Sequence, residues 1–119
     1  MLTESIAVKE YPLDVRAFYT MPSSTPGKSR SYDFMLRGQE VLSGAQRIHN
    51  HALLRSEMKR RGLDPDGPGL KDYVESFQYA TPPHAGGAFG LERIVANWLG
   101  LPNVRLASLF PRDPSRLSP

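Results

Sequence analysis

The sequence predicts an α+β fold, in which an antiparallel sheet is flanked by helices. Strand-like segments come first, on either side of Gly38, and segments with helical periodicity follow from about residue 51. A glycine-rich segment then leads into the last and clearest helical pattern. Strands, then helices, then a strand that feeds a helix together indicate a sheet covered by helices.

Three segments favour strands. The first, residues 6–9, is short, and the second and third are residues 32–37 and 40–46. Gly38 separates the latter two, so they are predicted to pair as neighbouring antiparallel strands.

Residues 51–61 predict the first helix. Leu54 and Met58 lie four residues apart, basic residues fill the last turn, and Gly62 suits the position that ends a helix. Pro68 is expected to open the second helix. The buried face of that second helix is predicted to consist of Leu70, Tyr73, Val74 and Phe77, at the i, i+3, i+4, i+7 spacing.

The third helix carries an apolar stripe and is closed by Gly100. The stripe consists of Leu91, Ile94, Val95, Trp98 and Leu99. The aromatic residues Tyr73, Phe77 and Trp98 are therefore expected in the core.

Composition bounds the class of protein. The chain has 119 residues, enough for one compact domain, with 39% hydrophobic and 23% charged residues. No apolar run reaches the length of about 18 residues that a membrane span needs, so no membrane partner is expected. Cysteine is absent, which excludes disulfides and thiolate metal sites. The net charge of +3 is not clustered into a basic arm. The proline-rich end, FPRDPSRLSP, predicts an extended tail.

The segment HAGGAFGLER, residues 84–93, is the first candidate site. Glycines let a backbone approach a ligand closely, and a following helix start offers free N–H groups. Arg93 falls in the first helical turn, where a cation opposes the helix dipole, so it is better explained if it faces an anion. The alternative is a glycine bulge that simply leads into a helix.

The segment RGQEVLSGAQR, residues 37–47, is the second candidate site. Side chains alternate along a strand, so Glu40 and Leu42 face one side and Ser43 and Arg47 the other, unless a bulge intervenes. Arg47 suits a carboxylate because its fork donates two parallel hydrogen bonds, and Glu40 suits Mg²⁺ beside phosphates. The alternative is an exposed strand with scattered charges. The histidines, by contrast, lack the spacing of a zinc site.

Taken together, these stretches resemble the C-terminal end of cytoplasmic aspartate–tRNA ligases of the eukaryotic or archaeal type, which are class II aminoacyl-tRNA synthetases. The resemblance covers about nine-tenths of the chain and is carried, in the family's order, by YPLDVRAFYTMP, SYDFMLRGQEVLSGAQRIH, PPHAGGAFGLER and FPRDPSRLSP. GLER resembles the class II motif 3, and SGAQRIH with PPHAGG resembles aspartate enzymes more than asparagine or lysine enzymes.

The resemblance implies an enzyme that joins L-aspartate to ATP and transfers aspartate to tRNA in the cytoplasm, as a homodimer when complete. Glu40 would contact ATP through Mg²⁺, and Gly90, Leu91, Glu92 and Arg93 would form part of the ATP site. Glu40 and Arg93 would be the catalytic residues. Ser43 and Arg47 would hold aspartate, with Arg47 pairing its side-chain carboxylate.

The resemblance also implies that residues 1–119 are the C-terminal part of a catalytic domain, with motif 3 but without motifs 1 and 2 or the anticodon-binding domain. Two residues depart from the family pattern: Ala88 stands where motif 3 usually has glycine, and Gln39 replaces an acidic neighbour of Glu40. The chain by itself is therefore expected to be inactive. The alternative function is a non-catalytic module that binds a partner such as a full-length synthetase.

Overall fold

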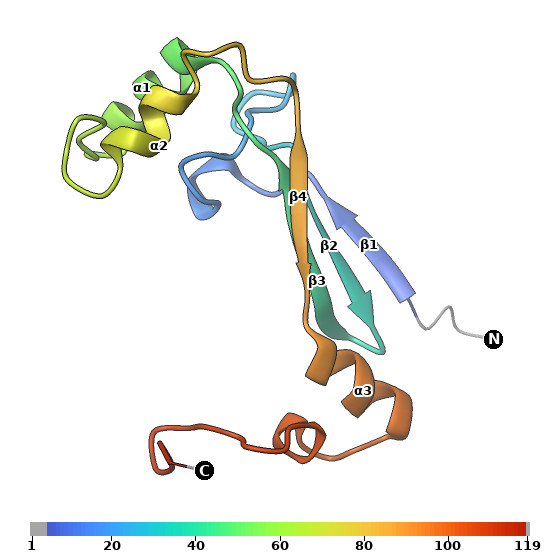
Figure 1. The fold of residues 1–119 in the computed structure, drawn as a ribbon. Coiled ribbons are helices and arrows are strands. Elements are labelled where there is room, and N and C mark those ends of the chain that lie inside the picture. Colours follow the sequence, from blue (N-terminus) through green and yellow to red (C-terminus); the bar gives the residue numbers. More distant parts are fainter. Residues whose placement is uncertain (1–4, 119) are drawn as a thin grey trace. The chain divides into compact units, whose positions relative to one another are not determined.

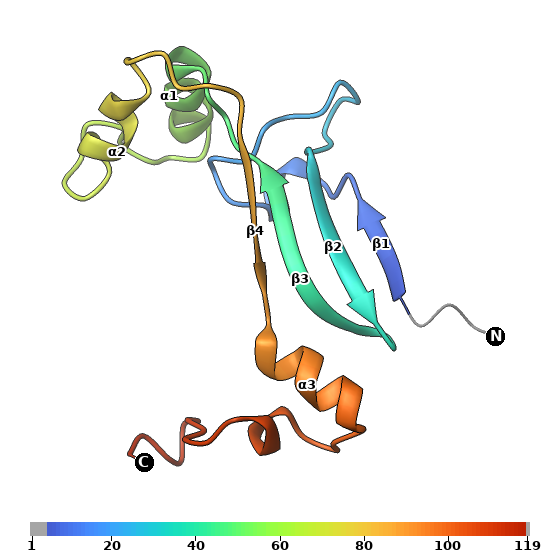
Figure 2. The same cartoon turned by 45° about the vertical axis from the view of Figure 1, so that its right-hand side comes forward.

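The computed structural model describes residues 5–118, which form a four-stranded sheet and several helices. In chain order the elements are β1 (Ser5–Lys9), the 3-10 helix η1 (Leu13–Val15), β2 (Ser31–Leu36), β3 (Gln39–Gln46), α1 (His51–Arg60), α2 (Lys71–Ser76), β4 (Ala85–Phe89), α3 (Leu91–Leu99) and the 3-10 helix η2 (Val104–Ala107). The strand order is β1-β2-β3-β4, and neighbouring strands run in opposite directions (Figures 1 and 2). The predicted α+β fold with an antiparallel sheet is confirmed.

The chain forms two compact units. Of the described residues, unit 1 consists of 5–8, 33–43 and 88–118, and unit 2 of 9–32 and 44–87. Unit 2 contains α1 and α2, whereas unit 1 contains α3 and η2. The strands contribute residues to both units.

A tight hairpin joins β2 to β3. Its two central residues, Arg37 and Gly38, have φ values of 49° and 81°. Positive φ at both central positions is the requirement of a type I′ turn, whose twist matches that of paired strands. The strands predicted on either side of Gly38 are therefore confirmed, with three of their four ends shifted by one residue.

The hydrophobic core of unit 2 lies between α1, α2 and the chain that follows β3. Its buried members are Ile48, Leu54, Met58, Val74 and Phe77. Phe18, Met21, Leu53 and Leu70 pack against them. The two α1 residues four apart thus point into this cluster, as the helical periodicity indicated, and so do Leu70, Val74 and Phe77 of the predicted face of α2. Tyr73, the fourth residue of that face, does not belong to the cluster.

The start of α2 was predicted wrongly. The helix begins at Lys71, not at Pro68, because Gly69 has a φ of 87°, which a right-handed helix cannot contain. Turns precede the helix instead: the Leu70 and Lys71 amides both donate to the Gly67 carbonyl, at 3.3 and 3.2 Å.

The helix α1 begins at His51, as predicted, and its last turn carries the predicted signals. Asn50 caps the first turn through a 2.9 Å hydrogen bond from the Leu53 amide to its Oδ1. Basic residues occupy the last turn, and Gly62 follows with a φ of 73°.

In unit 1, α3 ends at Gly100 as predicted, but its apolar stripe is not buried as expected. Gly100 ends the helix in the left-handed conformation, with a φ of 65°. Ala96 is the buried residue of the helix, and η2 contacts α3, whereas Trp98 is 81% exposed and Leu91 67% exposed. The expectation that Trp98 belongs to the core is therefore wrong for the structure of residues 5–118, because η2 is too small to cover the whole stripe.

The proline-rich end forms neither helix nor strand in residues 110–118. It contains one tight turn, in which Asp113 and Arg116 exchange backbone hydrogen bonds of 3.0 Å. Asp113 also pairs with Arg105 at 3.3 Å, so the tail is attached to η2. Pro119 lies outside the described residues. Among residues 5–118, no helix has the length and the hydropathy that a membrane span needs.

Replacing Asn50 by alanine is expected to destabilise unit 2, because the Leu53 amide loses its side-chain acceptor at the start of α1. The free energy of unfolding should fall by about 0.5–2 kcal/mol. Urea titration followed by circular dichroism measures the change. Asn50→Asp is the matched control, since aspartate retains an acceptor at the same position, and an equal loss in both variants would contradict the capping role.

Candidate functional site

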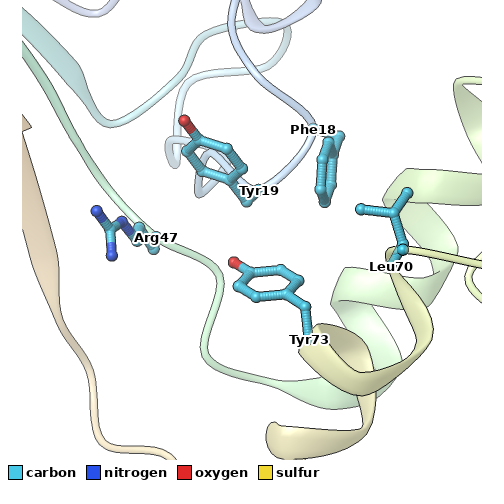
Figure 3. A pocket seen from close by; sticks show the side chains of 6 residues that line it. Phe18, Tyr19, Arg47, Leu70 and Tyr73 are labelled. Carbon is cyan, nitrogen blue, oxygen red and sulfur yellow. The ribbon is translucent and has the colours of Figure 1, made fainter.

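Arg47 lines a cavity in unit 2. The cavity has a volume of ≈ 440 Å³, and its wall consists of Phe18, Tyr19, Arg47, Gly69, Leu70 and Tyr73 (Figure 3). The backbone of Arg47 is fixed by its N–H, which donates to the His84 carbonyl at 3.0 Å. Within the described residues of unit 2, the guanidinium itself makes no hydrogen bond or ion pair. Its five N–H donors are therefore available to a small anion that reaches this residue.

The aromatic side of this cavity is rigid because its rings also contact the core. Tyr73 packs edge-to-face against Phe18 at 6.3 Å and against Phe77 at 4.9 Å. Its hydroxyl points to the side of the cavity on which Arg47 lies (Figure 3). Tyr73 is 36% exposed, so of the predicted core aromatics it is the one that sits at the boundary, while Phe77 is buried.

The environment of Tyr73 changes its acidity in two opposed ways. Burial raises the pKa of the Tyr73 phenol, because a buried phenolate loses hydration, and the Arg47 cation lowers that pKa in part. The two side chains are therefore electrostatically coupled.

Two glycines of unit 2 leave space for neighbouring side chains. A Cβ on Gly86 would lie 2.7 Å from Nη2 of Arg47. A Cβ on Gly44 would lie 2.6 Å from Cζ of Tyr32. Both distances are well below the separation of about 3.5–4.0 Å that non-bonded heavy atoms prefer. From the sequence, the glycines near residue 86 were expected to let the backbone approach a ligand. The sequence did not predict that Gly86 accommodates the Arg47 side chain.

In unit 1, Arg93 is paired with Glu40. The Arg93 Nη1 donates to the Glu40 backbone carbonyl at 2.9 Å and lies 3.4 Å from its carboxylate Oε1. Both side chains are close to half exposed. A cation in the first turn of α3 therefore has an anion opposite it within unit 1, and this ion pair accounts for its position without a ligand. A contact of Arg93 with ATP stays a prediction.

Ser43 is held by a carboxylate that sequence reasoning missed. Its Oγ donates to Oδ1 of Asp33 at 2.7 Å, and Asp33 is only 3% exposed. The signal was present in the sequence: an aspartate inside a predicted strand, between Tyr32 and Phe34, needs a buried partner.

The remaining predicted ATP-site residues begin α3. The Gly90 amide donates to the Val41 carbonyl at 2.8 Å, which ties the helix start to β3. Leu91 and Glu92 follow in the first turn and are exposed. Ala88 is exposed on β4, so its methyl group is accommodated. Gln39 accepts a hydrogen bond from Asn97, which gives this departure from the family pattern a structural role.

Among residues 5–118, no group of three or more His, Cys, Asp or Glu side chains is arranged to hold a metal ion. His84 instead contacts the Pro82 carbonyl through Nδ1 at 3.0 Å and stacks on Phe77.

The structure thus brings Arg47 together with Tyr19 and Tyr73 in unit 2, and Glu40 with Arg93, and Ser43 with Asp33, in unit 1. Ser43 and Arg47 belong to different units, so their joint action on one ligand stays a prediction.

Replacing Arg47 by alanine is expected to raise the pKa of Tyr73 further, because the cation that stabilises the phenolate is removed while burial persists. Burial gives Tyr73 a folded-state pKa above its unfolded value, so its contribution to stability is present below about pH 10 and is lost as the pH rises through the folded pKa. Spectroscopic titration of ring-labelled tyrosine measures the shift. Lys28→Ala removes an exposed cation of the same unit and should leave Tyr73 unchanged.

The chain was compared with known proteins. The family described as "tRNA synthetases class II (D, K and N)" matches residues 3–114. The cytoplasmic aspartate–tRNA ligase of Rattus norvegicus is 51% identical over 118 residues, which are 98% of this chain and 23% of that protein. The solved aspartyl-tRNA synthetase of Entamoeba histolytica superposes with a TM-score of 0.92 at 49% identity, over 98% of this chain and 24% of that one.

A more distant solved structure is the asparaginyl-tRNA synthetase of Pyrococcus horikoshii complexed with asparaginyl-adenylate. It is 34% identical, with a TM-score of 0.88, over 97% of this chain and 27% of that chain. The chain therefore spans about a quarter of the length of its relatives. With a family match that extends from residue 3 to residue 114, together with these likenesses in sequence and fold, the chain belongs to the class II tRNA synthetases of the D, K and N group.

Proposed function

We propose that residues 1–119 are the C-terminal part of the catalytic domain of an aspartate–tRNA ligase, which activates L-aspartate with ATP and transfers it to tRNA. One observation carries the choice of amino acid. Identity is 51% to an aspartate–tRNA ligase and 49% to a solved aspartyl enzyme, but 34% and 32% to solved asparaginyl enzymes. The chain thus resembles the aspartate branch more than the asparagine branch along its whole length.

Arg47 is the proposed anchor for the aspartate side chain. Its guanidinium borders a cavity large enough for an amino acid and has no protein partner in the described residues of unit 2. A guanidinium donates two parallel hydrogen bonds to a carboxylate, so it selects charge and geometry together. Ser43, oriented by Asp33, is the second proposed contact to aspartate.

ATP is the proposed second substrate, bound by Glu40, Gly90, Leu91, Glu92 and Arg93. Glu40 and Arg93 are the proposed catalytic residues of this segment, and the release of their ion pair would free a carboxylate and a cation for the nucleotide. Mg²⁺ commonly takes one or two carboxylates and completes its shell with phosphates and water. The half-exposed Glu40 carboxylate fits that donor set, and the bound ion would neutralise charge on the phosphates.

The proposal extends to the partners of the complete protein. The proposed partners are tRNA and, by the family resemblance, a second copy of the protein in a homodimer. The cytoplasm is the proposed location, because the curated relatives are named cytoplasmic aspartate–tRNA ligases.

The proposed function is tested in a chimera in which this chain replaces its counterpart in the rat aspartate–tRNA ligase. The chimera should support aspartate-dependent exchange of pyrophosphate into ATP, with aspartate strongly preferred over asparagine. Exchange that depends on asparagine, or no exchange by a folded chimera, would overturn the proposal.

Arg47→Lys in this chimera should raise the KM for aspartate far more than the KM for ATP. Lysine retains the charge but loses the two-pronged geometry, and disrupting a desolvated charge pair typically costs on the order of 2–5 kcal/mol. Arg93→Lys is the matched variant, and it should act mainly on the KM for ATP. Small, equal changes in both constants for Arg47→Lys would show that Arg47 does not bind the amino acid.

The 119-residue chain alone should give no aspartate-dependent exchange above background. Phosphoryl transfer requires positioned charges from several directions, and the proposed ATP site in this chain supplies a single cation, Arg93. The same exchange assay with purified chain measures this, and robust exchange by the chain would contradict it.

A second candidate is a non-catalytic module that binds a protein partner such as a full-length synthetase. The observation in its favour is the exposed apolar surface of unit 1, where Trp98 and Leu109 are 81% and 85% exposed. This candidate would be favoured if the chimera were inactive and if the purified chain, in a separate experiment, bound the intact rat ligase.

A further inference from the structure

We propose that Gly86 is a positioning residue for Arg47. Because Gly86 has no side chain, β4 leaves open the space in which the Arg47 guanidinium lies at the edge of the aromatic cavity. The consequence for catalysis rests on the proposed function, whereas the effect on the position of Arg47 does not.

The guanidinium of Arg47 lies directly over Gly86. A Cβ at this position would be 2.7 Å from Nη2, 3.2 Å from Cζ and 3.5 Å from Nε. All three atoms belong to the planar, charged end of the side chain. Since non-bonded heavy atoms settle at about 3.5–4.0 Å, one methyl group would push the guanidinium away from its present place.

The backbone does not explain why this residue is glycine. Gly38, Gly62 and Gly100 have positive φ values, which glycine adopts without strain. Gly86 has no positive φ and lies within the β4 strand, where alanine is compatible with the backbone. The space taken by Arg47 is therefore the reason for glycine that the structure supplies.

A methyl group at residue 86 should move Arg47 and not the fold. The atom it meets first is the end of a long, flexible side chain that is exposed to solvent. Gly44 is different, because a Cβ there would meet two ring carbons and the hydroxyl oxygen of Tyr32 at 2.6–2.8 Å, and a ring on a strand cannot rotate aside as freely. Gly86→Ala is thus expected to leave the free energy of unfolding nearly unchanged. Alanine also lowers the conformational entropy of the unfolded chain, which offsets part of any destabilisation.

Carboxylate recognition depends on where the guanidinium lies. The two parallel hydrogen bonds of an arginine–carboxylate pair require the fork to be held in a fixed plane. A misplacement of about 1 Å at a substrate-positioning group costs up to roughly 100-fold in rate. In Gly86→Ala we therefore expect the KM for aspartate to rise by roughly 10- to 100-fold, with little change in the KM for ATP.

The experiment uses the rat chimera that carries this chain, with four variants. Gly86→Ala adds one carbon beneath Arg47, and Ala85→Ser is the matched control, since it adds one heavy atom at the neighbouring exposed position of β4. Arg47→Ala removes the group that the methyl would meet. The double variant Gly86→Ala with Arg47→Ala completes a double-mutant cycle.

We expect Gly86→Ala to raise the KM for aspartate when Arg47 is present. In the Arg47→Ala background, Gly86→Ala should change that KM little further. Ala85→Ser should match the parent. An equal effect of Gly86→Ala in both backgrounds, or no effect on aspartate in the Arg47 background, would overturn the proposal.

Crystal structures of the parent chimera and of Gly86→Ala give a readout independent of activity. The Arg47 guanidinium should be displaced by about 1 Å or more with the β4 backbone unchanged. If Arg47→Ala itself leaves aspartate use intact, or the chimera is inactive, the proposed function fails, and the crystal structures alone decide the role of Gly86. A guanidinium that stays in its parent position in the Gly86→Ala structure overturns that role whatever the kinetics show.

Discussion

The burial of Ile48 is the constraint on which the candidate site of unit 2 depends. Its side chain is completely buried against α1 and α2, and its amide donates to the Tyr19 carbonyl at 2.8 Å. Successive side chains of an extended chain point to opposite sides, so a buried Ile48 turns the neighbouring Arg47 away from the core and toward the cavity. The core thus fixes the direction of the charge that the proposed function requires.

Apolar packing also positions Tyr73 on the wall of the cavity. Val74 is completely buried and holds α2 against the core, and Tyr73, its neighbour, then presents its hydroxyl to the cavity. The ring contacts of Tyr73 with Phe18 and Phe77 leave it little freedom to rotate. A cation and a phenol are therefore positioned by apolar packing, which is a stiffer support than surface hydrogen bonds provide.

Unit 1 is organised by polar contacts more than by a core. Arg93 links α3 to Glu40, Arg37 donates to the Asn97 carbonyl at 3.0 Å, and Ser43 is held by Asp33. Much of the apolar surface of α3 and the segment after it remains open in the described residues. An exposed ion pair contributes little to stability, so the pairing of Glu40 with Arg93 can be exchanged for a ligand at small cost. The pair is therefore compatible with the proposed ATP site.

Local patterns in the sequence determined the antiparallel strands around Gly38, the extent of α1, the end of α3 at Gly100 and three of the four residues on the predicted face of α2. Each of these depends on residues close together in the chain. Motif resemblance identified Glu40, Ser43, Arg47 and the start of α3 as candidates. The start of α2, the exposure of Trp98, the partner of Arg93, the support of Ser43 by Asp33 and the space above Gly86 were decided by tertiary structure. Each of these arises from groups that are distant in sequence or, at Gly69, from a backbone angle that composition does not fix. The sequence shows that residue 86 is glycine, but only the folded chain shows which side chain occupies the space that the missing Cβ leaves.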